Sequence, residues 1–355
     1  MKVKIGDLTK IKTGKLDANA SSEDGQYPFF TCSKEPLKIS TYSYDCECVL
    51  VAGNGDLNVK YYNGKFDAYQ RTYIIEDNGS GKIHMPYLYY FMESYIEELR
   101  KQAIGGVIKY IKLGNLTEAL IKLPSIDEQK AIVKLLNKLS HILVLRKDEI
   151  SKLDELIRAR FVELFGEPST NPRGWDETTI SDECYYIKDG PHKSLTDIGK
   201  ENGGHPFISV RNIVNGHIDF STARYISDED YADAIKKCHP EKGDMLYSKG
   251  GTTGIAKLID IDEKFANWVH VAVLKFDKSR LNGVFFENML NCFYCYEQSQ
   301  RLTKGIANRD LVLSAMAQIK LYCPPMELQN EFEEFVKQVD KSKVILPKSS
   351  FNVII

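Results

Sequence analysis

Two segments of the chain, residues 100–112 and 299–309, combine glycine with Lys and Arg and contain no Asp or Glu. Contact with a phosphate backbone needs cations and backbone N–H groups, and base edges are read by Arg, Lys, Asn or Gln side chains. A solvated junction between a helix and a loop is the plainer interpretation, but the same feature at equivalent positions in two halves favours contact with nucleic acid. The candidates are Lys101, Gly105, Gly106, Lys109, Tyr110, Lys304, Gly305, Asn308 and Arg309.

Two glycine-rich loops supply a second set of candidates. Residues 53–55 can form a plain hairpin turn, and residues 250–254 resemble a phosphate cradle without the GxxxxGK[ST] pattern. With their flanking cations, both interpretations stay open, turn geometry alone and contact with nucleic acid. Tyr69 and Trp268 with His270 are more typical of strand cores or rims and are minor candidates. The set is Gly53, Asn54, Gly55, Lys60, Arg71, Lys249, Gly250, Thr252, Thr253, Lys257 and His270.

The sequence lacks the patterns of common nucleotide and cofactor sites. It has no P-loop, no glycine-rich cofactor loop in a βαβ unit and no Asn-Pro-Pro-aromatic tetrapeptide of amino-methyltransferases. Residues 127–130 include the acid-x-Lys spacing of a nuclease, but acids at the start of a helix stabilise its dipole. We therefore expect no catalytic residue and no cofactor in this chain.

The eight cysteines suggest a disulfide framework, a metal site or buried core residues. Residues 1–7 lack the apolar core of a secretory signal, and no run of about 18 apolar residues is present to span a bilayer. We therefore expect a reducing cytoplasmic setting and no membrane partner, in which thiols are mostly small core residues. Cys292 and Cys295 have CxxC spacing, but no second Cys or His pair stands at zinc-ligand spacing, so no metal is expected.

The chain repeats itself with an offset of 200 residues. The segments around Pro124 and Pro324 match, and Gln129 coincides with Gln329. Ahead of each lies a stretch of short β-branched and aromatic runs broken by Gly and Asn, which is typical of strands joined by turns. Each half is therefore predicted to be a compact α+β domain followed by a helix.

A helix is expected after each repeated proline. The first can run from Ser125 to Phe165 without Gly or Pro, which corresponds to about 60 Å of helix. Its apolar residues alternate at spacings of four and three, as in a coiled-coil seam, and the same spacing returns after Gln329 and ends before Pro347. The seam comprises Ile132, Leu136, Leu139, Leu143, Ile150, Leu153, Ile157, Phe332, Val336 and Val339.

These elements predict the domain boundaries. The first domain covers 1–123, the first long helix 124–166, a linker dense in Pro and Gly 167–174, the second domain 175–323, and a shortened second helix with its tail 324–355. With 355 residues, of which 43% are hydrophobic, the chain is long enough for two domains with cores. The net charge of −2 means that any basic face must be local.

The order of these motifs resembles the specificity subunits of type I restriction-modification systems, over nearly the whole chain. The resemblance rests on the segments 4–8, 105–114, 123–130, 164–168 and 171–175. No single segment is diagnostic, whereas their order, duplicated within one chain, is specific.

The resemblance implies a DNA-reading subunit without catalytic chemistry. The implied α+β fold has two pseudo-symmetric globular target recognition domains, separated by long helices that pair as an antiparallel coiled coil. Each domain would read half of a bipartite double-stranded DNA site. The seam would also dock two methyltransferase subunits and, through them, restriction subunits, so S-adenosylmethionine, ATP and Mg are expected only in partners. The second helix has only about 22 residues before Pro347, roughly 33 Å, and lacks the family's usual long continuation.

Two other functions remain as alternatives. A fragment of a fused restriction and methylation enzyme would turn over S-adenosylmethionine on DNA with Mg, although the missing cofactor motifs argue against it. A coiled-coil scaffold that binds only proteins would not retard DNA in a gel.

Overall fold

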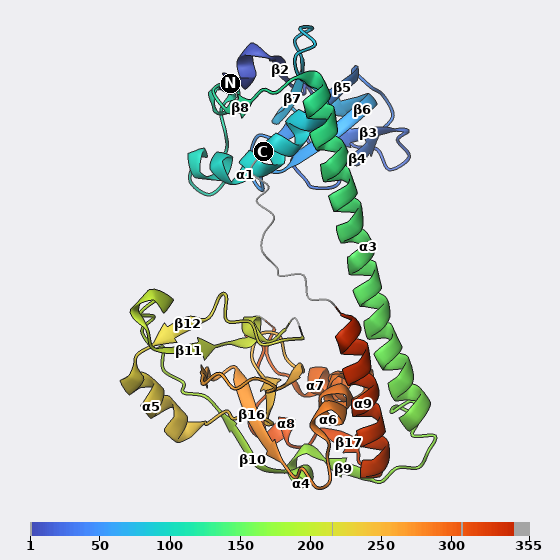
Figure 1. The fold of residues 1–355 in the computed structure, drawn as a ribbon, viewed down its shortest axis with the longest axis vertical. Coiled ribbons are helices and arrows are strands. Elements are labelled where there is room, and N and C mark those ends of the chain that lie inside the picture. Colours follow the sequence, from blue (N-terminus) through green and yellow to red (C-terminus); the bar gives the residue numbers. More distant parts are fainter. Residues whose placement is uncertain (1, 215, 307, 344–355) are drawn as a thin grey trace. The chain divides into compact units, whose positions relative to one another are not determined.

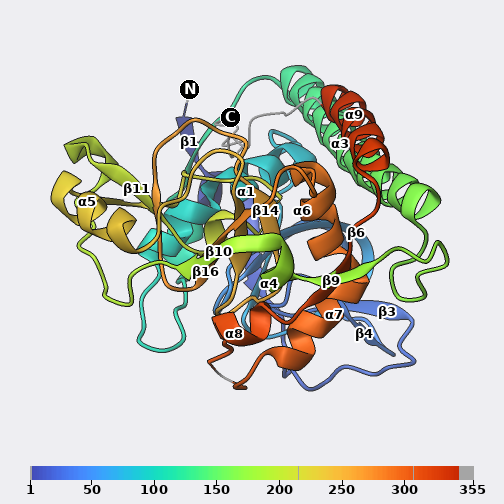
Figure 2. The same cartoon turned by 90° about the horizontal axis from the view of Figure 1, so that it is seen from below.

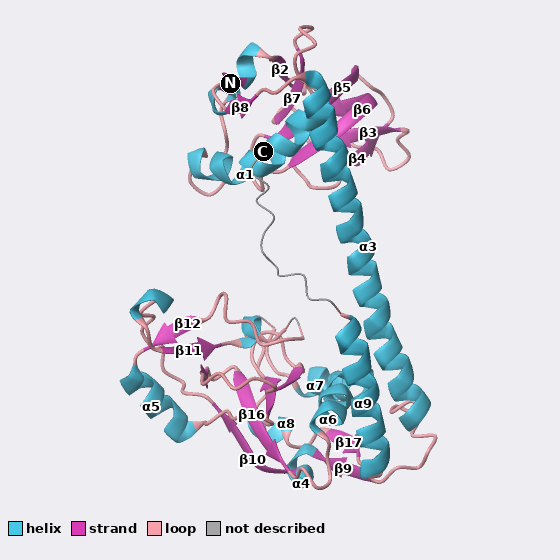
Figure 3. Cartoon of the chain, viewed as in Figure 1, coloured by secondary structure: helices cyan, strands magenta, loops and turns pink. Residues whose placement is uncertain are grey.

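The computed structural model describes residues 2–214, 216–306 and 308–343 (Figure 1). The chain divides into two compact units after Lys147. Each unit combines a strand-rich body with helices, as the colouring by secondary structure shows (Figure 3). The expected α+β class is therefore confirmed.

The first unit is built on a six-stranded sheet with the order β2-β7-β5-β6-β3-β4. All neighbouring strands are antiparallel except β3 and β6, which run parallel. Residues of β5 alternate between two cores, because successive side chains of a strand point to opposite faces: Val49 belongs to one cluster and Leu50 to the other. The strands are β2 (Thr9–Thr13), β3 (Tyr27–Phe30), β4 (Leu37–Ile39), β5 (Tyr44–Ala52), β6 (Val59–Ala68) and β7 (Thr72–Asp77).

Shorter elements close the first unit. Strand β1 (Lys2–Lys4) pairs with β8 (Leu120–Lys122), and η1 (Ile5–Asp7) follows β1 directly. Helix α1 (Met85–Gln102) packs against the sheet through residues such as Leu88 and Met92, and α2 (Leu113–Thr117) leads into β8.

The second unit repeats this plan with insertions. Its sheets have the orders β10-β16-β13-β14, β12-β11-β15 and β17-β9. The strands are β9 (Glu177–Thr179), β10 (Cys184–Asp189), β11 (His205–Ile208), β12 (Arg224–Ile226), β13 (Met245–Ser248), β14 (Ala256–Leu258), β15 (Ala266–Asn267), β16 (Val271–Phe276) and β17 (Lys320–Tyr322). The helices are α4 (Ile180–Glu183), η2 (Lys200–Asn202), η3 (Val210–Asn212), α5 (Asp228–Lys237), α6 (Gly283–Asn291), α7 (Phe293–Leu302), α8 (Leu313–Met316) and α9 (Met326–Ser342).

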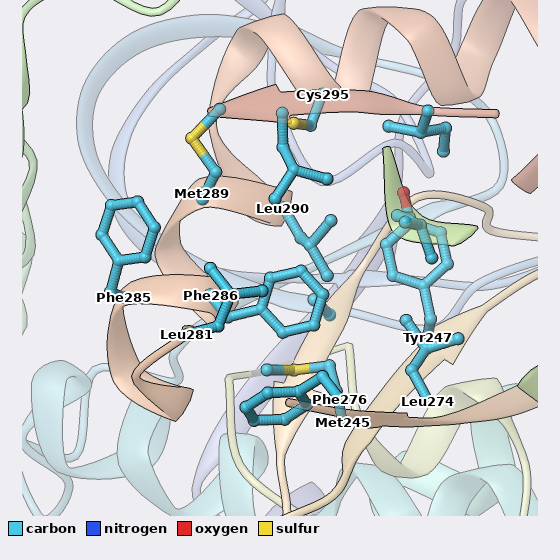
Figure 4. Packing of buried hydrophobic residues seen from close by; sticks show 14 of the residues in the cluster. Met245, Tyr247, Leu274, Phe276, Leu281, Phe285, Phe286, Met289, Leu290 and Cys295 are labelled. Atoms are coloured by element: carbon cyan, nitrogen blue, oxygen red, sulfur yellow. The ribbon is translucent and has the colours of Figure 1, made fainter. Parts of the chain in front are cut away.

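The core of the second unit lies between β13, β16 and the helices α6 and α7. Figure 4 shows Met245, Tyr247 and Leu274 of the strands facing Phe286 and Leu290 of α6. Cys295 is fully buried in this cluster, and all eight cysteines are free. The CxxC segment therefore contributes its second thiol to the core, as a small apolar residue does.

The two repeated glutamines make equivalent hydrogen bonds in their units. Gln129 is fully buried, accepts a hydrogen bond from the backbone N–H of His84 at 2.8 Å and donates to the carbonyl of Pro124 at 3.0 Å. Gln329 is equally buried, accepts from the backbone N–H of Asn282 at 2.8 Å and donates to the carbonyl of Pro324 at 2.7 Å. Each amide thus ties the start of one helix to the start of another, which explains why Pro and Gln recur together.

Helix α3 (Ile126–Phe165) is one continuous helix of 40 residues, as predicted. Its start is fixed by Ser125 and Glu128, since the backbone N–H of Ser125 donates to the Glu128 carboxylate at 2.8 Å. Helix α9 lies beside the C-terminal part of α3 in both orthogonal views (Figures 1 and 2). Residues 344–355, which include the predicted end of the second helix, lie outside the described residues.

Candidate nucleic-acid interface

In the first unit, the predicted glycine-rich loop and the predicted cationic loop are hydrogen-bonded to each other. The backbones of Ile104 and Tyr110 bond reciprocally, at 3.0 and 2.8 Å, and close the loop between them. The N–H of Gly55 donates to the carbonyl of Lys109 at 2.9 Å, and that of Ile111 donates to the carbonyl of Gly53 at 2.9 Å. Residues 53–55 and 104–110 therefore form one surface element, here called the first loop pair.

The second unit contains the same arrangement, here called the second loop pair, residues 249–251 with 304–306 and 308–310. The backbones of Lys304 and Asp310 bond reciprocally, both at 2.9 Å. The N–H of Gly251 donates to the carbonyl of Arg309 at 2.9 Å, and that of Leu311 donates to the carbonyl of Lys249 at 2.7 Å. All four hydrogen bonds recur, so the structure brings together the same candidate segments twice.

Each loop contains a glycine that no other residue can replace without strain. Gly105 has φ +115°, and a Cβ on it would lie 2.6 Å from the carbonyl oxygen of Ile108. Gly305 has φ +84°, and its Cβ would lie 2.2 Å from the carbonyl oxygen of Asn308. L-residues with side chains rarely adopt these angles, so glycine sets the tight shape of both loops.

Lys109 of the first loop pair and cations near that pair face solvent to different degrees. Lys109 is exposed and has no ion-pair partner among the described residues, and Arg71 is exposed while its carbonyl holds the N–H of Gly53 at 2.8 Å. Lys101 is exposed beside Glu98, with 3.6 Å between the charged atoms. Lys60 is half-buried and donates to Asn58, and burial lowers the pKa of its amine.

The first loop pair also borders a hollow of about 460 Å³. Asn54, Gly55, Tyr69 and Ile108 all line it. Tyr69, a minor candidate in the sequence, therefore lies with the main candidates of its unit.

Two predicted lysines of the second unit are held in ion pairs. Lys249 is 5% exposed, and its amine lies 2.9 Å from Asp310 and 3.6 Å from Asp189. Lys257 is 9% exposed and lies 3.2 Å from Glu287. Because carboxylates of the same unit neutralise both charges, these lysines support the domain and do not present free cations. Asp310 and Glu287 are distant from these lysines in the sequence. The absence of Asp and Glu next to each lysine therefore gives no sign of the ion pairs.

Other predicted residues of the second unit stay near the surface. Lys304, Asn308, Thr252 and His270 are exposed, whereas Gly250 and Thr253 are buried. A Cβ on Gly250 would lie 2.0 Å from the ring of His270, so glycine is needed for this close approach.

Arg309 is half-buried, and its guanidinium is positioned by neighbours. Its Nη2 donates to the side chain of Gln300 and, at 3.4 Å, to the hydroxyl of Thr253. Both described hydrogen bonds use Nη2. The described residues therefore leave the Nη1 and Nε donors of the guanidinium without a partner. A guanidinium held in this way suits a base edge that presents two acceptors.

A cleft of about 230 Å³ in the second unit contains functional candidates that the sequence analysis missed. It is lined by Phe207, Ser209, Arg211, Arg224 and Trp268. The guanidinium of Arg224 lies 5.9 Å from the centre of the Trp268 ring, and the buried indole N–H of Trp268 has no hydrogen-bond partner among the described residues. The cleft therefore combines two cations with an unused donor.

The cleft adjoins the second loop pair through His270. The rings of Trp268 and His270 are 5.0 Å apart, and the carbonyl of His270 accepts from the N–H of Lys249 at 2.8 Å. The tripeptide from Trp268 to His270 was a signal for this region. Arg211 and Arg224 join it because β11 pairs in parallel with β15 and antiparallel with β12, where Phe207 lies opposite Arg224.

The predicted helix pairing is present between the C-terminal part of α3 and α9. Phe332 is fully buried, with its ring centre 5.4 Å from that of Phe161 and 5.7 Å from that of Phe165. Ion pairs Arg160–Glu331 at 2.6 Å and Asp154–Lys343 at 2.9 Å show that the helices run antiparallel.

The predicted seam divides into segments with different surroundings. Ile157, Phe332, Val336 and Val339 are buried in the core of the second unit, with Leu153 partly buried against it. Ile132 packs on the core of the first unit, whereas Leu136, Leu139 and Leu143 are half-buried and Ile150 is 38% exposed. Near them Leu135, Ile142 and Val144 are 66%, 52% and 64% exposed, so this stretch of α3 presents apolar side chains to solvent.

Among the described residues, no three His, Cys, Asp or Glu side chains are grouped so that they could hold a metal ion. No helix in the described part of the chain is both long and apolar enough to cross a membrane.

The sequence matches the family described as Type I restriction modification DNA specificity domain over residues 1–155 and again over 172–354. A stretch of 156 residues is 39% identical to the Type I restriction enzyme EcoDI specificity subunit of Escherichia coli, covering 44% of this chain and 34% of that protein. The chain therefore aligns with only about a third of that relative's length. It is also 21% identical to the Type I restriction enzyme MjaVIII specificity subunit of Methanocaldococcus jannaschii, over 95% of this chain and 85% of that protein.

Solved structures share the fold. A type I restriction-modification S subunit from M. genitalium has a TM-score of 0.59 at 18% identity, covering 97% of this chain and 90% of its own. A chain from a structure of complex assembly and conformational transition of the type I R-M system has a TM-score of 0.50 at 15% identity, with the same coverage of 97% and 90%.

Proposed function

The chain belongs to the family of type I restriction-modification DNA specificity subunits, and we propose that each of its units reads one half of a bipartite double-stranded DNA site through its loop pair. The observation that carries the proposal is the recurrence of the loop pair, with the same four backbone hydrogen bonds, in both units. Each loop pair combines a close-packed glycine with a cation and an amide side chain, which are the groups that contact phosphates and base edges. These are Lys109 and Asn54 in the first loop pair and Arg309 and Asn308 in the second.

The proposed role is non-catalytic. S-adenosylmethionine, ATP and Mg would act in methyltransferase and restriction subunits, because the sequence carries no motif for them. The purified chain incubated with S-adenosylmethionine, Mg²⁺ and DNA should therefore show no turnover. Methyl transfer or cleavage by the chain alone would favour the alternative of an enzyme fragment.

The exposed apolar stretch of α3 is the proposed docking surface for two methyltransferase subunits, and restriction subunits would join through them. Leu135, the half-buried Leu139 and Ile142 lie on one face of this stretch, and Leu145 borders that face. Exposed apolar side chains that gather in one place favour a protein partner over solvent.

DNA binding is the first expected result. The full chain, alone and with the methyltransferase of its host, should retard duplexes that carry the motif found by methylome sequencing of that host. Affinity should fall steeply with salt, because each neutralised phosphate adds about 0.9 to the log–log slope. Absence of any DNA binding by the assembled complex would contradict the proposed function and favour a protein-binding scaffold.

A single substitution on α3 tests the docking surface. Leu139→Asp should weaken methyltransferase binding by more than about tenfold, because a carboxylate would be desolvated in the interface. Since Leu139 is only half-buried in the described structure, the free energy of unfolding should change by less than about 1 kcal/mol. The measurements are co-purification and urea unfolding, with Ser140→Asp on the exposed neighbouring position as control. Unchanged assembly of the Leu139→Asp variant would show that this stretch is not the docking element.

A further inference from the structure

The tips of both loop pairs carry exposed apolar side chains, and one in each loop is wholly exposed. Val107 is 104% exposed and Ile108 62% in the first loop, and Ile306 is 101% exposed in the second. A single exposed apolar residue is ordinary on a protein surface. Here, however, the exposure occurs within the same hydrogen-bonded loop in both units, at neighbouring positions of that loop, which points to a shared use.

Backbone hydrogen bonds fix both loops at their bases. Each loop is closed at its base by a reciprocal backbone pair, Ile104 with Tyr110 and Lys304 with Asp310. Further backbone hydrogen bonds tie each loop to its glycine-rich partner loop. Val and Ile are also stiff at χ1 because they branch at Cβ, so little side-chain freedom is lost when a partner covers them.

The charge around the tips indicates the kind of partner. The segments 105–109 and 305–309 contain no Asp or Glu, whereas Lys109 and Arg309 follow the tips within three residues. An apolar tip with cations behind it suits a duplex, whose phosphates attract the cations while its bases offer apolar faces. A protein-docking patch is normally several hundred Å² wide, but each tip offers only one or two side chains.

We propose that Val107 and Ile306 insert between bases of the two half-sites as apolar wedges, an inference that rests on the proposed DNA-reading function. Proteins that bend DNA use Leu, Ile, Phe, Met or Pro in this way and partly unstack the step they enter. The proposal adds a contact that hydrogen-bonding side chains cannot make. It also gives each unit a preference for steps that unstack easily, such as TA and CA/TG.

The test uses the full chain assembled with its methyltransferase and a duplex in which 2-aminopurine replaces, one at a time, the adenines of the half-sites that the host does not methylate. The methylated positions are left out because a methyltransferase turns its target base out of the stack. Unstacking raises the fluorescence of this base, so the wild type should give an increase at one step in each half-site. Val107→Ala should remove the increase in one half-site and Ile306→Ala in the other. Each substitution should weaken binding by about tenfold or more through the lost apolar contact, with the salt dependence unchanged because no phosphate contact is lost.

Two matched substitutions control for loss of apolar surface elsewhere. Leu120 on β8 and Phe293 at the start of α7 are 51% and 69% exposed and lie outside the loop pairs, so Leu120→Ala and Phe293→Ala should bind DNA as the wild type does. The tip variants should also unfold at the wild-type urea concentration, because their side chains are exposed in the free protein.

The outcomes separate this inference from the proposed function. If the wild type binds the motif without any increase in 2-aminopurine fluorescence, or the tip variants keep wild-type affinity, the wedge is wrong and DNA reading stands. If the tip variants lose methyltransferase binding and keep DNA binding, the tips are protein contacts and the wedge is again wrong. If the assembled wild type binds no DNA, the proposed function itself fails.

Discussion

Replacing Phe332 with alanine should lower the free energy of unfolding of the second unit by about 3–5 kcal/mol, the usual range for emptying a buried aromatic site. The side chain is fully buried between Phe161 and Phe165, which both also contact Phe285. Loss of the ring would leave a cavity between α9 and these two residues of α3. We therefore expect α9 to separate from α3 before the rest of the unit unfolds.

Urea unfolding followed by tryptophan fluorescence measures this effect, because Trp175 and Trp268, the two tryptophans of the chain, both belong to the second unit. Phe335→Ala is the matched control. Phe335 lies on the same helix but is only partly buried, with Arg160 over its ring at 5.6 Å, so the expected loss is about 1–2 kcal/mol. Equal losses for the two variants would mean that the helices are not held together by the buried ring.

The parts of the fold that could be predicted are those encoded by neighbouring residues. The uninterrupted helix from Ser125 to Phe165 was predicted from the absence of Gly and Pro together with the apolar spacing of four and three, and the structure has it from Ile126 to Phe165. The repeat at Gln129 and Gln329 was visible as well, although its meaning was not. That each amide binds the start of another helix depends on residues 45 and 47 positions away.

The parts that could not be predicted depend on contacts between distant segments. Lys249 is followed by glycines and threonines and Lys257 is flanked by apolar residues, and only the fold shows that Asp310 and Glu287 neutralise them. The cleft at Trp268 was missed for the same reason. The spacing of four and three likewise identifies the apolar positions of a helix, but it does not show which of them pack against another helix.

Lys109→Ala and Arg309→Ala should each weaken the reading of one half-site and leave the other unchanged. Lys109 is exposed without a described ion-pair partner, so we expect it to bind a phosphate. Its loss should lower affinity for all variants of its half-site alike and flatten the log–log salt slope by about one. Arg309 is held by Gln300 and Thr253, so we expect it to read a base edge, at a cost of about 1–3 kcal/mol confined to one position.

The measurement is binding of the assembled complex to a panel of single-base variants across both half-sites, at several salt concentrations. Arg301→Ala is the control for Arg309→Ala, because Arg301 lies in the same cationic segment but is paired with Glu297 at 2.7 Å and should matter little. Lys122→Ala on β8 serves the same purpose for Lys109→Ala. If both variants lost affinity evenly over both half-sites, the proposal that each unit reads its own half-site would be wrong. A substitution in one loop pair would then act on the whole duplex and not on the bases that its own unit contacts.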